Sequence, residues 1–203
     1  LDKTGTITEG RMKVDNVKVY NEKCMPHSIQ KMMTAFVNEM TDNNATFMAL
    51  KDYYQGEDKF EVADTMAFSS ERKWSSISFK NEGSIVLGAP ERLIEKSKME
   101  MPKEIIDAQK AGRRMLFIAY TNKVISDEKL PELEIVAAIT LDDPLRKNAK
   151  EMLGFFKKQN VDIKVISGDN PLTVSSIAKK AGLESYDAYI DLSTISSDDE
   201  IPE

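Results

Sequence analysis

The spacing of apolar residues over the first two thirds of the chain predicts an antiparallel sheet flanked by helices. Period-two or continuous apolar patterns, typical of strands, occupy residues 12–20, 61–68, 75–79, 84–87 and 114–121. Apolar residues at helical spacing occupy 29–40, after Ser28 as a cap, and 45–54, and further helices are expected to open at Pro90 and Pro102. The second proline-led helix is expected to end at Gly112.

The rhythm changes at about residue 134, where strand and helix patterns alternate. The predicted order is a strand over 135–141, a helix over 147–159, a strand over 161–167 and a helix over 171–181. This order predicts a parallel sheet joined by crossover helices, with ligands at the carboxyl ends of its strands. We therefore expect residues 1–10 and 131–203 to form one α/β domain, interrupted by an inserted α+β domain over residues 11–130.

Composition narrows the function. A net charge of −6 and a pI near 5.1 give no reason to expect nucleic acid as a partner. One cysteine and one histidine make neither an internal disulfide nor a zinc site. No run approaches the roughly 20 apolar residues that span a bilayer.

The strongest chemical signal is the opening Asp2-Lys3-Thr4-Gly5-Thr6. A carboxylate is a nucleophile that can accept a phosphoryl group, and the lysine beside it adds positive charge. The hydroxyls and the glycine that follow can wrap a phosphate and its metal ion. We predict that Asp2 is the phosphoryl acceptor, that Lys3 and Thr4 assist it, and that Asp2 and Thr4 hold the metal.

A second phosphate signal lies at the join of the last predicted strand and helix, Ser167-Gly168-Asp169-Asn170-Pro171. Asn170 can cap the helix and Pro171 suits its first turn, so the free N–H groups there favour an anion. Ser167 can donate its hydroxyl to a phosphoryl oxygen, and Gly168 lets the backbone approach closely.

The opening motif resembles the phosphorylation signature of P-type cation-transporting ATPases. The resemblance implies a Rossmann-like sheet of the haloacid-dehalogenase type, ATP and Mg²⁺ as cofactors, and an aspartyl phosphate that drives cation transport. It also assigns Ser167 to Asp169 to the family's TGDN element, with serine replacing threonine. Related soluble phosphatases usually carry an acid/base Asp two residues after the nucleophile, whereas this chain has Thr4.

The same resemblance assigns nucleotide contacts to both predicted domains. Phe68 to Lys73 resembles a segment whose aromatic ring stacks on adenine, with Lys73 near the pocket. Gly88 belongs to a motif that allows close approach of the base, and Arg114 corresponds to an arginine that reaches the phosphates. Residues 142–146 resemble the family's hinge, which implies that Asp143 and Arg146 lie near the sugar and phosphates, and Asn170 completes this set.

Departures from the family pattern limit what the chain should do alone. The family's adenine-contacting glutamate corresponds to Phe47 and a lysine of its pocket corresponds to Leu87, so we expect weak nucleotide binding, roughly −4 to −6 kcal/mol. The family's phosphate-binding lysine and its GDGxND segment are not in the chain, so we expect little or no turnover.

The expectation is a piece of a larger membrane protein, on the cytoplasmic face of the cell membrane, whose transported cation binds in a membrane domain absent from this chain. Spacing favours the calcium and magnesium branch over the heavy-metal branch. A soluble phosphatase with a cap domain and a non-catalytic nucleotide-binding module remain as alternatives.

Overall fold

The computed structural model describes residues 1–167 and 171–190, which form parts of two compact units. The first unit contains Leu1–Gly10, Lys110–Gly112 and the chain from Leu145, and the second contains Arg11–Gln109 and Arg113–Pro144.

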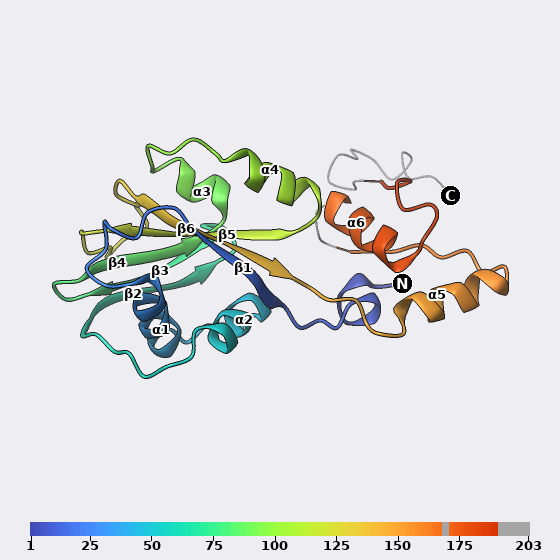
Figure 1. Cartoon of the computed structure of the whole chain (residues 1–203), viewed down its shortest axis with the longest axis horizontal. Coiled ribbons are helices and arrows are strands. Elements are labelled where there is room, and N and C mark those ends of the chain that lie inside the picture. Colours follow the sequence, from blue (N-terminus) through green and yellow to red (C-terminus); the bar gives the residue numbers. More distant parts are fainter. Residues whose placement is uncertain (168–170, 191–203) are drawn as a thin grey trace. The chain divides into compact units, whose positions relative to one another are not determined.

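The second unit is built on one sheet in which every neighbouring pair of strands is antiparallel (Figure 1). The strand order across the sheet is β1-β6-β5-β4-β3-β2. The strands are β1 (Lys13–Val19), β2 (Val62–Ser69), β3 (Trp74–Phe79), β4 (Gly83–Gly88), β5 (Arg114–Thr121) and β6 (Glu134–Asp142). The predicted antiparallel sheet is therefore confirmed, with strand ends shifted by at most one residue.

Helices cover both faces of this sheet, α1 and α2 on one face and α3 and α4 on the other (Figure 1). Their bounds are α1 Ile29–Glu39, α2 Ala45–Tyr53, α3 Pro90–Ile94 and α4 Lys103–Lys110. Side-chain oxygens of Ser28 and Asn44 accept the backbone N–H groups of Lys31 and Phe47, which fixes where the first two helices begin. Apolar side chains of each helix pair pack on the sheet, so a core lies on either side of it.

One predicted strand belongs to a different sheet from the one expected. The strand over 135–141 was assigned to the parallel sheet, but it forms β6, which pairs antiparallel with both β1 and β5. That assignment is wrong because β6 fills the gap between these two strands, and both of its faces are covered by the cores of the second unit. The compact units consequently divide after Pro144 and not at residue 131.

The described part of the first unit contains α5 (Ala149–Lys158) and α6 (Pro171–Ala181), which pack with Ile7 around a small core. The backbone N–H of Ile166 donates to the carbonyl of Leu1 at 2.8 Å, and Asp2 and Ile166 form a parallel bridge. The strand predicted over 161–167 is reduced to this bridge, because among the described residues its only ladder partners are Leu1 and Asp2. None of the described helices is long and apolar enough to cross a membrane.

Candidate functional site

The predicted phosphoryl acceptor begins a sharply turned loop. Asp2 is exposed at its parallel bridge with Ile166, and the backbone then turns through Lys3–Ile7 with Gly5 at a φ of +82°. A φ of this sign is strained for residues with a β-carbon, which explains the glycine in the loop. The carboxylate is therefore offered to solvent at the start of a loop of fixed shape.

Thr8 holds this loop closed from inside. It is fully buried, and both its backbone N–H and its hydroxyl donate to the carbonyl of Lys3, at 3.1 and 3.2 Å. The same hydroxyl oxygen accepts the N–H of Gly5 at 3.3 Å. These bonds close a ring over the five residues after Asp2 with little conformational freedom.

Arg146 holds the loop from outside. Its backbone N–H donates to the carbonyl of Ile7 at 3.0 Å, and its Nε donates to the carbonyl of Thr8 at 3.2 Å. Its Nη2 donates to the carbonyl of Gly5. The contact of Arg146 with nucleotide stays a prediction, whereas the bonds described here orient the loop that begins at Asp2.

The remaining predicted catalytic residues differ in exposure. Lys3 is buried at 4% exposure, Thr4 is exposed and Ser167 is half-buried. Gly168, Asp169 and Asn170 lie outside the described residues, so their predicted roles have no structural counterpart here. Within residues 1–167 and 171–190 no three acidic, histidine or cysteine residues gather as a metal site.

The predicted nucleotide residues of the second unit lie along one end of its sheet, where neighbouring strands begin or end. Phe68 and Lys73 flank the turn between β2 and β3, Gly88 ends β4, Arg114 begins β5 and Asp143 follows β6. The antiparallel register places these strand ends beside one another, because Ser69 pairs with Trp74, Trp74 with Gly88, Gly88 with Phe117 and Arg114 with Leu141.

The turn between β2 and β3 presents an aromatic ring and a cation. Phe68 is 45% exposed, which is unusual for a phenylalanine and leaves a ring face available for stacking. Lys73 has a left-handed backbone with φ +61°, and its N–H closes the turn on the carbonyl of Ser69 at 2.7 Å. Its ammonium lies 3.4 Å from a carboxylate oxygen of Glu91.

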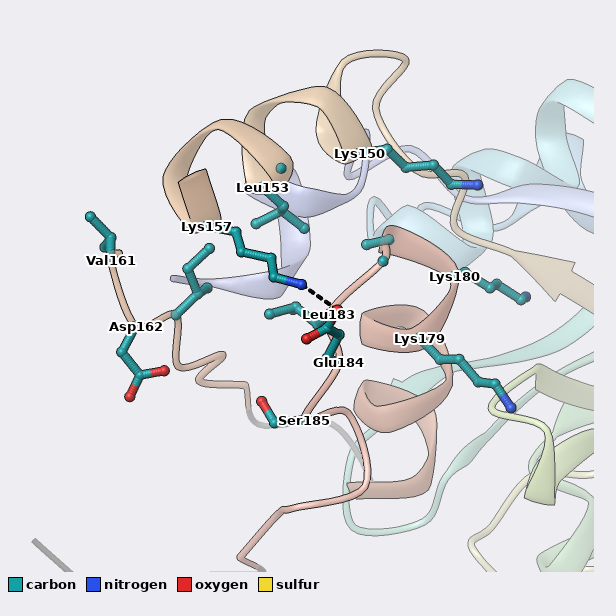
Figure 2. Close-up of a pocket in the computed structure, with 14 residues that line it drawn as sticks. Lys150, Leu153, Lys157, Val161, Asp162, Lys179, Lys180, Leu183, Glu184 and Ser185 are labelled. Carbon is teal, nitrogen blue, oxygen red and sulfur yellow. Dashed lines mark hydrogen bonds and ion pairs between the residues drawn. The ribbon is translucent and has the colours of Figure 1, made fainter. Parts of the chain in front are cut away.

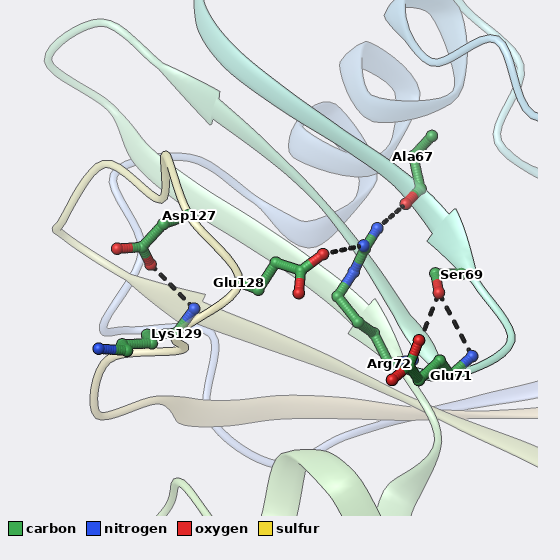
Figure 3. Close-up of polar contacts among 7 residues, drawn as sticks. All are labelled: Ala67, Ser69, Glu71, Arg72, Asp127, Glu128 and Lys129. Atoms are coloured by element: carbon green, nitrogen blue, oxygen red, sulfur yellow. Dashed lines mark hydrogen bonds and ion pairs between the residues drawn. The ribbon is translucent and has the colours of Figure 1, made fainter.

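Arg72, which belongs to the Phe68–Lys73 motif but received no role from it, fixes this turn (Figure 3). Its guanidinium donates to the carbonyl of Ala67 at 2.7 Å and to Glu128 at 2.6 Å, and lies 5.3 Å from the Trp74 ring centroid. Glu128 belongs to the connection between β5 and β6. Arg72 therefore ties the turn that presents Phe68 to that connection.

Three sequence positions have a structural reason for their identity. A β-carbon on Gly88 would lie 2.7 Å from the β-carbon of Trp74 and 2.9 Å from the carbonyl oxygen of Lys73. Glycine is thus required there by strand packing, whether or not a base approaches. Phe47 and Leu87 are buried at 4% and 6% exposure in the core under α1 and α2, where the family's charged residues would lack solvent.

The first turn of α2 and the loop before it contact two of these strands, β5 and β2. Arg114 donates to the hydroxyl of Thr46 at 3.1 Å. Four residues earlier, a carboxylate oxygen of Asp42 accepts the backbone N–H of Phe68 at 3.3 Å. Sequence reasoning missed Asp42, because no motif marks it and its place beside Phe68 exists only in the fold.

A cavity of about 440 Å³ lies in the first unit between α5 and α6 (Figure 2). Leu153, Ile163 and Leu183 line it, together with several lysines, and Lys157 pairs with Glu184 across it. Its described lining includes none of the residues predicted to bind phosphate or nucleotide. The cavity therefore gives no support to the predicted phosphate and nucleotide sites.

Comparison with known proteins shows which family the chain belongs to. The family model described as haloacid dehalogenase-like hydrolase matches residues 1–203. The chain belongs to the haloacid dehalogenase-like hydrolases. Within this family it is 36% identical over 202 residues to the probable cation-transporting ATPase exp7 of Streptococcus pneumoniae, covering 98% of this chain and 25% of that protein.

Other matched proteins are also cation-transporting ATPases. The calcium-transporting ATPase CtpE of Mycobacterium tuberculosis is 34% identical over 92% of this chain and 24% of that protein. A zinc-transporting PIB-type ATPase structure aligns with a TM-score of 0.62 at 18% identity, covering 90% of this chain and 27% of that one. The chain thus spans about a quarter of the relatives it matches.

The predicted resemblance to P-type ATPases is confirmed, since the curated relatives of this haloacid dehalogenase-like chain are cation-transporting ATPases. The predicted fold class is confirmed as well, by the family match and the aligned structure. The calcium and magnesium branch stays a prediction.

Proposed function

We propose that this chain is the ATP-binding and phosphoryl-accepting part of an ATP-driven cation pump. The observation that carries the proposal is the loop after Asp2. An exposed carboxylate starts a turn whose shape is fixed by the buried Thr8 and by the carbonyl bonds of Arg146. A fixed loop holds a nucleophile in the geometry that in-line phosphoryl transfer needs.

In this proposal Asp2 attacks the γ-phosphorus of ATP and forms an aspartyl phosphate, with ADP as the leaving group. Lys3, Ser167 and Gly168 would reduce the negative charge on the phosphoryl oxygens. Thr4 in place of an acid/base leaves hydrolysis of the phosphate unassisted at that position, which suits an intermediate that persists through a conformational step.

Mg²⁺ is the cofactor that this chemistry implies. It commonly binds through one or two carboxylates together with substrate phosphates and water, so the single exposed carboxylate of Asp2 fits it. Asp2 and Thr4 would hold the ion, which would supply positive charge to the phosphoryl oxygens. The other carboxylates among the described residues form no group around Asp2.

The second unit would bring ATP to this loop. Its support is the common end of the sheet, where an exposed aromatic ring on β2 and an arginine on β5 lie at positions suited to the base and the phosphates. Lys73 would add positive charge beside the base. Asp143, Arg146 and Asn170 would complete the phosphate and sugar contacts.

The pump itself would be a longer membrane protein, with this chain on the cytoplasmic face and the cation bound in its membrane domain. Similarity to calcium-transporting relatives favours the calcium branch. The isolated chain is expected to bind nucleotide and to turn over poorly or not at all.

Two measurements test this function. Phosphoenzyme formation is followed in the full-length gene product with γ-labelled ATP, comparing wild type with Asp2→Asn. Acid-stable label that disappears in the variant supports the assignment of Asp2, and label retained in the variant rejects it. Titration of the 203-residue chain with AMP and ATP, by Trp74 emission and by amide chemical shifts, tests the base site.

Phe68→Ala is the matched variant for that titration. Saturable binding that is lost in the variant supports stacking on Phe68. Absence of any response to several millimolar nucleotide would reject the nucleotide role and leave the Asp2–Thr6 motif as a sign of ancestry alone.

A further inference from the structure

One carboxylate oxygen at the proposed base site is buried without a partner. Asp42 lies in the loop between α1 and α2, and its Oδ1 accepts the backbone N–H of Phe68 at 3.3 Å. Its Oδ2 is covered from solvent and has no hydrogen-bond partner among the residues that the structure describes. A carboxylate oxygen is a strong acceptor, so leaving it unpaired disfavours the nucleotide-free arrangement.

The position of this oxygen is set by the residue that would stack on the base. Because Asp42 accepts the backbone N–H of Phe68, its carboxylate is tied to the residue whose ring would stack on the base. Asp42 is half-buried and lies in a loop, so its second oxygen would have to turn outward to meet a base stacked on Phe68.

We propose that Asp42 is the residue that selects adenine, by accepting a hydrogen bond from the exocyclic amino group of the base. This inference rests on the proposed nucleotide site. Stacking on Phe68 tolerates every base, since each base has a π-face, and therefore provides affinity without selection. A carboxylate only accepts, so it pairs with the amino group of adenine and repels the carbonyl oxygen that hypoxanthine and guanine carry at the same position.

The neighbouring contacts agree with this orientation. Thr46, on the first turn of α2 after the Asp42 loop, accepts the guanidinium of Arg114. A nucleotide whose base lies at Asp42 and whose phosphates lie toward Arg114 would span the start of this helix. The base contact of Asp42 and the residue that holds Arg114 would then lie at opposite ends of one short segment.

The test compares AMP with IMP, which differ in the 6-position group that Asp42 would contact and in the proton that hypoxanthine carries at the neighbouring N1. Dissociation constants are measured for both nucleotides by amide chemical-shift titration of the 203-residue chain. Wild type should bind AMP about tenfold or more tightly than IMP, as expected for a hydrogen bond to a charged acceptor. Asp42→Asn should abolish or reverse this preference, because its amide can accept from Phe68 while offering N–H donors to the base.

Asp64→Asn is the matched control. Asp64 lies on β2, the strand that contains Phe68, and its Oδ1 also accepts a backbone N–H, that of Thr65 at 2.7 Å. This variant should keep the wild-type ratio of the two dissociation constants. Asp42→Ala is measured beside it, with thermal unfolding of each variant, and should lose the preference by weakening AMP alone.

The outcomes separate this inference from the proposed function. If AMP and IMP bind wild type with equal affinity, or if Asp42→Asn keeps the wild-type ratio, Asp42 does not read the base. Should Phe68→Ala still abolish binding of both nucleotides in that case, the base site stands and only its selectivity is misassigned. If wild type binds neither nucleotide, the base site and the role of Asp42 both fail.

Discussion

Removal of the Arg146 guanidinium should loosen the loop that begins at Asp2 without unfolding the chain. The change is Arg146→Met, which keeps most of the aliphatic length. It removes two bonds, from Nε to the carbonyl of Thr8 and from Nη2 to the carbonyl of Gly5, and leaves the backbone bond to Ile7 in place. Hydrogen bonds from a charged donor contribute about 1.5–3 kcal/mol each when buried.

Both bonds lie near the surface, so we take about 2 kcal/mol as their joint effect on local opening. That free energy corresponds to a roughly thirtyfold increase in the equilibrium constant for opening. The amides of Gly5 and Thr8 report it directly, since one donates to the Thr8 hydroxyl and the other to the Lys3 carbonyl. Hydrogen exchange followed by two-dimensional NMR measures both amides.

The control is Arg113→Met, which removes an exposed ion pair with Asp15 at 3.1 Å. It should leave exchange at both loop amides unchanged. Exchange that accelerates less than twofold in Arg146→Met would show that the guanidinium does not hold the loop, and the positioning argument for Asp2 would lose its main support. Acceleration throughout the first unit would instead indicate general destabilisation.

Three further predictions concern the second unit. Phe47→Glu, which restores the family's residue type, should weaken folding by about 3–5 kcal/mol in urea denaturation instead of improving nucleotide affinity, because the ring is buried 6.5 Å from Phe36; unchanged stability would contradict this burial. Gly88→Ala should destabilise by about 1–3 kcal/mol through the clash with Trp74, measured as a lowered Tm without nucleotide. Burial raises the pKa of Tyr54, so its contribution to stability is complete below about pH 10 and falls as pH rises further; Tyr54→Phe should remove up to about 1 kcal/mol of the loss between pH 8 and pH 11, and equal losses in both proteins would exclude this cause.

Local signals in the sequence predicted elements better than they predicted partners. The run over 135–141 is apolar on both faces, and such a run fits a buried parallel strand and a central antiparallel strand equally well. Its neighbours in the sheet are β1, which lies far from it in sequence, and β5, which a loop separates from it. The periodicity of residues 135–141 therefore holds no information about which strands this run pairs with.

Prediction of the candidate site had a similar limit. Short motifs identified Phe68, Lys73 and Gly88, and the register of the strands places these residues at one end of the sheet. Asp42 carries no local signal, because its carboxylate acquires a role only through contact with a strand 26 positions away. For Arg146, the motif suggested nucleotide, whereas its bonds to loop carbonyls depend on tertiary geometry.

The pairing of β1 with β6 has a consequence for how the second unit can be used. Lys13, near its beginning, faces Asp142, near its end, across one ladder. Both ends of the polypeptide that forms this unit therefore emerge side by side, from central and edge strands of the same sheet. A segment with adjacent ends can be inserted into a surface turn of a host domain, or joined end to end into a circle, without stretching either partner. The order of the strands thus makes this unit suited to transfer as a module.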